Sequence, residues 1–178
     1  MGYDKMFAQI NSLTPYLVKA KEQTEEMAKS LAKHHKDTDY LIDLHSAAKG
    51  RSNMPQVRAN LADPPSNIIA KAFGIEVILD SKPPKGSLRR CAMDEVSGTM
   101  TYEGGGADNL DHEAVQVAVH GVLNILRSLH VIPGNPSRPR FRILASGSTW
   151  LRAAEGGLLD MYVGPSSVDE SGEVVAPV

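Results

Sequence analysis

Two short polar groups follow apolar runs, and their residue types are suited to hydrolytic chemistry. Asp43-Leu44-His45 closes an apolar run that begins at Tyr40, and Glu103 stands directly before three glycines. A histidine nitrogen is a common zinc ligand, and a carboxylate at an open strand end can exchange a proton with substrate or water. Asp43 could orient His45 through a hydrogen bond. Taken alone, His45 also fits a structural histidine, and Glu103 also fits a solvated carboxylate.

Arginines near these groups are candidates for binding an anionic part of a substrate. Arg89 and Arg90 precede the strand expected to carry Glu103, and Arg51 and Arg58 lie in the segment after the first candidate strand. A guanidinium group holds a carboxylate through two parallel hydrogen bonds. The Arg89-Arg90 pair fits the solvated face of a helix equally well, so both interpretations stay open.

The elements that must position these residues alternate between strand and helix. This alternation predicts a three-layer α/β fold, with a mostly parallel or mixed sheet between flanking helices. Neighbouring strands are expected at 40–45, 75–79 and 99–103, and helices at 14–35, 66–73, 87–96 and 111–130. Residues 46–65 are rich in Gly, Asn, Pro and Arg and are expected to form a loop, and 104–106 to end the third strand. Since functional groups gather at the carboxyl ends of strands, His45 and Glu103 should face one cleft.

The pattern changes after Pro133. Helical periodicity is absent there, and short β-like runs follow at 141–144, 150–153, 158–163 and 174–175. The sequence therefore predicts an α/β domain over residues 1–135 and an incomplete small β domain over 138–178.

Composition excludes several classes of protein. The 178 residues are 42% hydrophobic and 22% charged with a net charge of -2, so no basic excess points to nucleic acid. A single cysteine, Cys91, excludes an internal disulfide framework and favours a reducing compartment. No apolar run approaches the roughly 18 residues that span a bilayer. A soluble, cytoplasmic protein is expected.

Five segments together resemble one family in one order. They read DYLIDLHSAAKGRSNMPQVRANL, AKAFGIEVILDSKPPKGSLRRCAMDEV, MTYEGGG, HGVLNILRSLHVIPG and STWLRAAEGGLL. The chain resembles the carboxyl-terminal half of the succinylglutamate desuccinylase/aspartoacylase family, whose fold is similar to that of the zinc carboxypeptidases, over about residues 25–163.

The resemblance implies a zinc-dependent deacylase that acts on N-acyl amino acids or related small amides. It implies that His45 is a histidine ligand of a single zinc ion and that Glu103 is the general base or acid that works on the zinc-bound water. Arg89, Arg90 and Arg51 are then candidates for holding a carboxylate of the substrate.

The sequence also departs from the family pattern. The family takes two zinc ligands from a His-x-x-Glu motif, which this sequence lacks, and the nearest pattern is His34-His35-Lys36-Asp37. The family's Asn-Arg substrate-binding motif is missing as well. Zinc occupancy is therefore in question, and a non-catalytic remnant that acts as a binding or oligomerisation module is the alternative. A sheet without its leading strands leaves an unpaired edge, so a homo-oligomer or a partner chain is expected to cover it.

Overall fold

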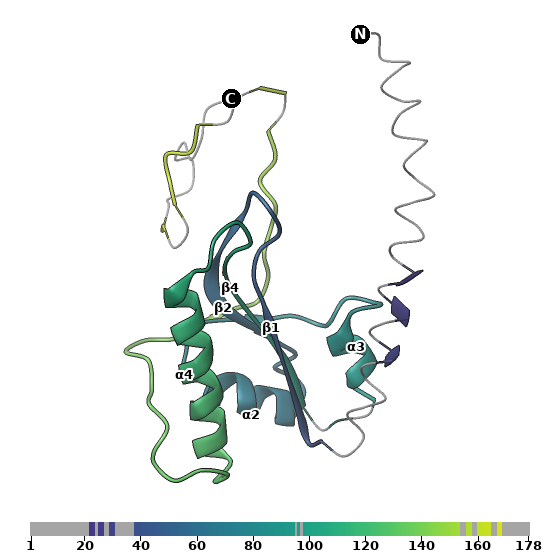
Figure 1. Cartoon of the computed structure of the whole chain (residues 1–178), viewed down its shortest axis with the longest axis vertical. Coiled ribbons are helices and arrows are strands. Elements are labelled where there is room, and N and C mark those ends of the chain that lie inside the picture. The colour runs from purple at the N-terminus through teal and green to yellow at the C-terminus, as the bar shows by residue number, and fades with distance from the viewer. Residues whose placement is uncertain are drawn as a thin grey trace.

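The computed structural model describes residues 22–23, 25–26, 29–30, 38–94, 96, 98–153, 156–157, 160–164 and 167–168 (Figure 1). Five strands of these residues form one sheet: β1 (Tyr40–His45), β2 (Ser52–Ala59), β3 (Val77–Asp80), β4 (Gly98–Gly106) and β5 (Ile143–Ala145). The helices are α2 (Pro64–Ala72), α3 (Leu88–Ala92) and α4 (His112–Ser128). None of the helices in the described residues is long and apolar enough to cross a lipid bilayer.

The strand order is β1-β4-β2-β3-β5. β4 is parallel to β1 and antiparallel to β2, while β3 is parallel to both β2 and β5. This mixed sheet with flanking helices confirms the predicted fold class. The predicted contact of β1 with β4 is also confirmed, with Leu44 opposite Tyr102. The expectation that β3 adjoins β4 is wrong, because β2 lies between them.

β2 was the strand that the sequence did not predict, since residues 46–65 were expected to form a loop. The alternation of buried Val57 and Ala59 with the more exposed Arg58 is typical of a strand with one face on the core. Pro55 hides this signal, because proline has no N–H to donate. The ladder to β4 shifts register between Asn53 and Gln56, which lets the strand accommodate the proline.

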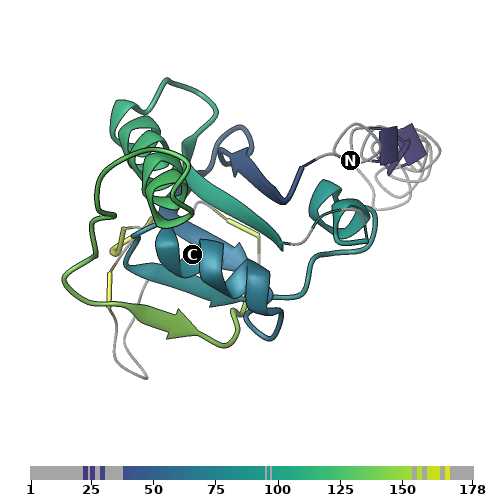
Figure 2. The same cartoon turned by 90° about the horizontal axis from the view of Figure 1, so that it is seen from below.

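The main core lies between one face of the sheet and the helices α2 and α4. Met100, Val57 and Ile78 from the sheet pack there against Ile69 of α2 and Phe73, the residue that caps its C-terminus. The opposite face carries a smaller apolar cluster formed by Leu41, Ala92 and Val96 beside α3. Figure 2 shows α4 and α3 on opposite sides of the sheet. The two faces of β1 and β4 therefore have different surroundings.

Side-chain caps fix where the helices begin. Asp63 accepts a hydrogen bond from the Ser66 N–H, so α2 starts at Pro64 rather than at the predicted residue 66. Asp111 caps α4 in the same way, and this helix confirms the prediction at 111–130 within two residues. α3 is capped by Ser87 and is shorter than the predicted helix at 87–96.

The glycines after Glu103 continue β4 instead of ending it, contrary to the prediction. Gly105 and Gly106 pair with β2, so the strand continues to Gly106. Gly105 has a φ of +70°, and a Cβ there would lie 3.1 Å from that of Ala114. Glycine thus lets the first turn of α4 approach the strand closely.

The first strand after residue 138, β5, belongs to the main sheet. β5 overlaps the predicted run at 141–144 and pairs with β3. The described residues of the runs at 150–153 and 158–163 form no strand, and residues 174–175 lie outside the described residues. Of the predicted helix at 14–35, residues 22–23, 25–26 and 29–30 are described and are helical. The boundary between two domains stays a prediction.

Candidate functional site

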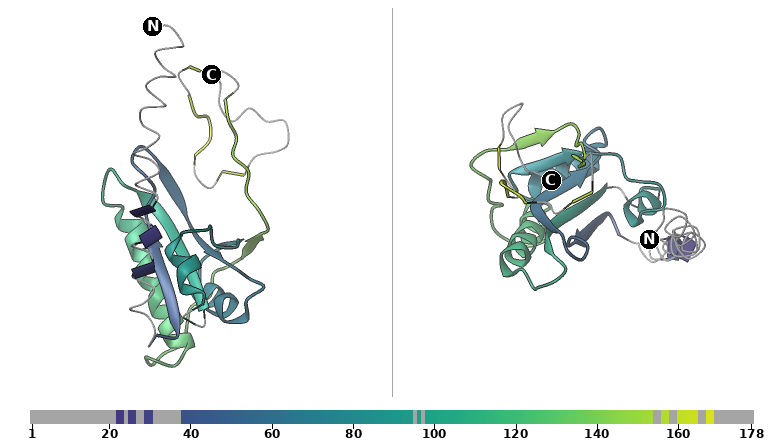
Figure 3. Two further views of the ribbon diagram at one scale, coloured as in Figure 1. Left: turned by 90° about the vertical axis from the view of Figure 1, so that its right-hand side faces the viewer. Right: turned by 90° about the horizontal axis from the view of Figure 1, so that it is seen from above.

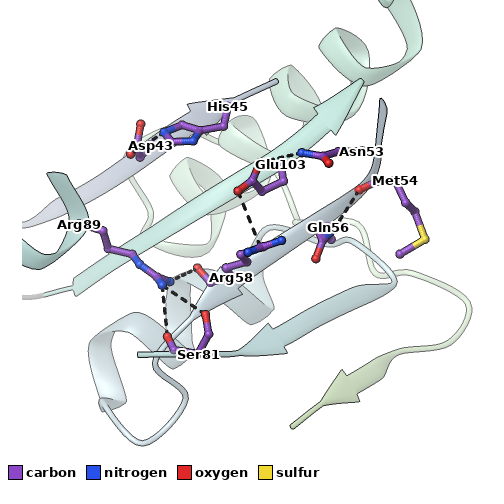
Figure 4. Close-up of polar contacts among 9 residues, drawn as sticks. All are labelled: Asp43, His45, Asn53, Met54, Gln56, Arg58, Ser81, Arg89 and Glu103. Atoms are coloured by element: carbon purple, nitrogen blue, oxygen red, sulfur yellow. Dashed lines mark hydrogen bonds and ion pairs between the residues drawn. The ribbon is translucent and has the colours of Figure 1, made fainter. Parts of the chain in front are cut away.

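His45 and Glu103 lie side by side on the face of the sheet that α3 covers. They are paired positions in the parallel ladder of β1 and β4. Paired residues of adjacent strands direct their side chains to the same face, with backbones about 4.8 Å apart. Figure 4 shows both side chains on this face, together with Asp43 of β1 and Arg58 of β2. The structure thus brings His45 and Glu103 together on one face of the sheet, and the cleft predicted between them stays a prediction.

Asp43 holds the imidazole of His45. The Asp43 Oδ2 atom lies 2.9 Å from His45 Nε2, so in the neutral ring Nε2 carries the proton and Nδ1 keeps its lone pair. This hydrogen bond raises the pKa of His45 above 6.5, partial burial opposes it, and the charges of Asp43 and Glu103 add to the rise. The His45 side chain is 49% exposed, so Nδ1 could bind a metal ion or a polar group that approaches from solvent.

Two neighbours on β2 position the carboxylate of Glu103. Asn53 Nδ2 donates a hydrogen bond of 2.9 Å to Glu103 Oε2. Arg58 Nε lies 3.7 Å from Glu103 Oε1, within the range of an ion pair but too far for a hydrogen bond. Arg58 Nε is buried and has no hydrogen-bond partner among the residues that the structure describes. Arg58 Nε itself is closed off from solvent, whereas the Arg58 side chain as a whole is 39% exposed and could meet an acceptor on a substrate.

The other predicted arginines are placed differently. Arg89 is 4% exposed, and its guanidinium donates to the Arg58 carbonyl at 2.6 Å and to the carbonyl and hydroxyl of Ser81. Burial, followed by the charge of Arg58, lowers the pKa of Arg89. Arg89 thus supports the β2 backbone at Arg58, beneath the site. Its predicted contact with substrate stays a prediction.

Arg90 and Arg51 do not converge on Glu103. Arg90 is exposed and forms an ion pair with Asp94, one helical turn away, at 3.5 Å. The guanidinium carbon of Arg51 lies 5.8 Å from the ring centroid of Trp150, beyond the start of β2. Their roles in substrate binding are untested.

The donors at the site do not complete a zinc site. Asp43 is already bonded to His45, and Glu103 to Asn53. In the described part of the chain, no three His, Cys, Asp or Glu side chains are placed to hold a metal ion. His34 and Asp37, the nearest pattern to the missing motif, lie outside the described residues. The described residues thus supply one good nitrogen donor, whereas catalytic zinc has three protein ligands.

A cavity of about 530 Å³ lies near the site but mostly on the opposite face of the sheet. Leu44, Tyr102 and Gly104 line one side of it, and α4 lines the other. His45 borders the cavity, whereas Glu103 and Arg58 do not. This apolar space is therefore separate from the polar face on which Glu103 lies.

The sequence did not indicate Asn53 as a site residue, and it indicated Arg58 only as a weaker candidate for binding an anionic group of the substrate. Both residues belong to β2, which was expected to be loop. The alternation from Gln56 to Ala59 was the signal that could have placed Arg58 on the same face as Glu103, since Gln56 pairs with Glu103 in the antiparallel ladder.

Comparison with known proteins assigns a family to this arrangement. The family profile described as "Succinylglutamate desuccinylase/Aspartoacylase catalytic domain" matches residues 5–129. No curated protein sequence matches the chain significantly.

Solved structures share the fold at low sequence identity. One is a succinylglutamate desuccinylase/aspartoacylase from Rhodobacter sphaeroides, with a TM-score of 0.65 and 22% identity over 80% of this chain and 48% of that one. Another is the product-bound ectoine utilization protein EutE (DoeB) from Ruegeria pomeroyi, with a TM-score of 0.66 and 18% identity over 81% and 48%. A third is a succinylglutamate desuccinylase from Silicibacter sp. TM1040, with a TM-score of 0.63 and 20% identity over 81% and 48%. The chain thus spans about half the length of these structures.

Proposed function

Since the chain belongs to the succinylglutamate desuccinylase/aspartoacylase family, we propose that it carries part of the active site of an amide hydrolase. The substrates proposed are N-acyl amino acids or related small amides. The observation that carries this proposal is the pairing of His45 with Glu103 on one face of the sheet, beside the partly exposed side chain of Arg58.

Glu103 is proposed as the proton carrier of the reaction. Its carboxylate accepts a proton from the attacking water and then gives it to the amine that leaves when the C–N bond breaks. The hydrogen bond from Asn53 fixes one carboxylate oxygen and leaves the other free of hydrogen bonds to described residues. The partly exposed side chain of Arg58 is suited to bind a carbonyl or carboxylate oxygen of the substrate, because a guanidinium group presents parallel N–H donors.

The proposed cofactor is one zinc ion with His45 Nδ1 as a ligand. Asp43 supports this assignment, since a carboxylate on the far nitrogen is the usual partner of a metal-bound histidine. The described residues alone do not fit a full zinc site. Further ligands must therefore come from outside them, and the proposal includes a second polypeptide, either another copy or a partner chain, that covers the open edge of β1.

One observation favours a second candidate, a non-catalytic binding or oligomerisation module. It is the same shortage of metal donors among the described residues. On either proposal Cys91, the single cysteine of the sequence, favours a reducing and hence cytoplasmic compartment.

A chimaera tests the proposed activity. The part of the Rhodobacter sphaeroides protein that precedes its match to this chain would be fused ahead of residue 38 of this chain. We expect the folded chimaera to bind zinc and hydrolyse N-acyl amino acids. Glu103→Gln should lower kcat by about 100-fold or more while zinc stays bound, since general-base catalysis contributes about that much. His45→Ala should lower zinc content as well. A folded, zinc-loaded chimaera that is inactive, or one unaffected by Glu103→Gln, would favour the non-catalytic candidate.

A further inference from the structure

Glu103 lies at the middle of a row of three side chains on the face of the sheet that α3 covers. β4 lies inside the sheet, between β1 and β2, whereas β1 and β5 form its two edges (Figure 3). Glu103 is paired with His45 on β1 and with Gln56 on β2. Paired residues direct their side chains to the same face, and opposed side chains of an antiparallel pair lie about 5 Å apart. Gln56 thus flanks Glu103 on the side opposite to His45.

The side-chain amide of Gln56 has a free oxygen. Its Nε2 atom donates to the carbonyl of Met54 at 3.5 Å, back along the same strand (Figure 4). Its Oε1 atom accepts no hydrogen bond from any residue that the structure describes. The neighbours on β2 provide donors instead, since Asn53 donates to Glu103 and Arg58 carries only N–H groups. Gln56 is partly exposed, so its oxygen is a neutral acceptor within reach of a molecule bound beside Glu103.

We propose that Gln56 is a specificity-determining residue, whose Oε1 atom accepts a hydrogen bond from the N–H of the substrate's amide. The inference rests on the proposed function, in which Glu103 gives a proton to the amide nitrogen. A nitrogen within reach of Glu103 is also within reach of Gln56, because the two residues are directly opposed in the ladder.

Arg58 fits the same orientation of the substrate. It follows Gln56 by two residues on β2, on the same face and about 7 Å farther along the strand. In an N-acyl amino acid, a single carbon atom separates the amide nitrogen from the carboxylate. Gln56 therefore binds the N–H while the longer side chain of Arg58 reaches back to the carboxylate. The amino-acid half of the substrate lies over β2 in this orientation.

This arrangement selects secondary amides as the substrate class. An N-acylated amino acid with an amide N–H satisfies Gln56 Oε1, whereas an N-acylated proline or N-methyl amino acid has no N–H to donate. A tertiary amide bound in the same place covers the oxygen with carbon and leaves it without a donor. Because Gln56 is only partly buried, the expected preference for the secondary amide is about tenfold.

Two ligands that differ in this one group test the inference. N-acetylglycine has an amide N–H, and N-acetylsarcosine has a methyl group in its place. We expect the metal-free full chain to bind N-acetylglycine about tenfold more tightly, as measured by titration of backbone amide shifts in NMR spectra. Gln56→Met keeps the side-chain length and removes the acceptor, so the ratio of the two dissociation constants should fall to about one. Gln116→Met, at an exposed position of α4, is the matched control and should keep the native ratio.

A second variant separates hydrogen bonding from packing. Gln56→Glu keeps an acceptor oxygen but adds a negative charge, so it should weaken the binding of both ligands and keep the preference for N-acetylglycine. A ratio near one in the native chain, an unchanged ratio in Gln56→Met, a lost preference in Gln56→Glu, or binding of neither ligand would overturn the proposal. No turnover is measured, so an inactive zinc-loaded chimaera would count against the proposed hydrolysis, and a missing preference would count against Gln56 alone.

Discussion

His45 and Glu103 occupy paired positions on β1 and β4, yet each side chain has a hydrogen-bond partner of its own. His45 is held by Asp43 and Glu103 by Asn53, at 2.9 Å in each case. A direct hydrogen bond between His45 and Glu103 would close the space between these two side chains. Separate partners fix both groups and leave their functional atoms, Nδ1 and Oε1, for a third species.

The first prediction concerns the pKa of His45 in the metal-free chain. The hydrogen bond to Asp43 is the largest cause of its rise above 6.5. Asp43→Asn removes the carboxylate, so the histidine pKa should fall, as measured by the pH dependence of its ring proton shifts. Thr101→Ser, on the same face, is the control and should leave the titration near its native position. An unchanged pKa in Asp43→Asn would show that Asp43 does not hold the ring.

The same shift predicts how stability depends on pH. A histidine whose pKa is raised by folding stabilises the folded chain in full below its unfolded value of about 6.5, and this contribution disappears as the pH rises through the raised value. The free energy of unfolding of the metal-free chain should therefore decrease across that window. In Asp43→Asn this decrease should be smaller, as measured by urea unfolding at several pH values.

The second prediction separates the two neighbouring arginines of α3. Arg89 is buried and donates to Arg58 and Ser81, whereas Arg90 is exposed beside Asp94. Arg89→Lys loses several of these hydrogen bonds and should lower the free energy of unfolding by about 2 kcal/mol. Arg90→Lys should change it by less than about 0.5 kcal/mol, because exposed ion pairs contribute little. Urea unfolding checks both, and equal effects would contradict a supporting role for Arg89.

The third prediction concerns the attachment of α4 to the sheet. The buried Tyr102 hydroxyl donates to the Ala114 carbonyl at 2.8 Å, and its ring stacks on Phe73. Burial raises the pKa of Tyr102 to about 12. Tyr102→Phe keeps the stacking and removes the hydrogen bond, so it should lower the free energy of unfolding by about 1 kcal/mol. Tyr162→Phe, at an exposed position, is the control and should have no measurable effect in the same urea titration.

The fold class could be predicted because the strands and helices around the core have clear patterns. β1, β4 and α4 follow from an apolar run, from the segment before the glycines, and from a long amphipathic helix. Strand order could not be predicted, because the sequence does not state which strands pair. β2 was missed for a local reason, since Pro55 and the surrounding polar residues are typical of loops.

The site was predictable only where strand ends carry unusual residues. His45 and Glu103 stand out at such positions, and the parallel register brings them to one face. Asn53 and Arg58 could not be placed without β2, and Arg89 reads as a surface arginine until its carbonyl acceptors are known. These contacts depend on tertiary structure, which pairs residues far apart in the sequence.

The last prediction concerns zinc, where family membership and the count of ligands point in different directions. The family suggests a hydrolase, but the site beside Glu103 provides one free histidine nitrogen, and the described residues contain no group of three suitable side chains. A zinc ion with a single protein ligand stays mostly water-coordinated and binds weakly. We therefore expect the purified chain to keep well below one equivalent of zinc after dialysis, and to show no hydrolysis of N-acyl amino acids when zinc is added. Metal analysis by mass spectrometry and an assay of amine release measure the two quantities. If one equivalent of zinc is retained, turnover is observed and His45→Ala abolishes both, then the site has further ligands outside the described residues, with His34, Asp37 and a second copy of the chain as their candidate sources.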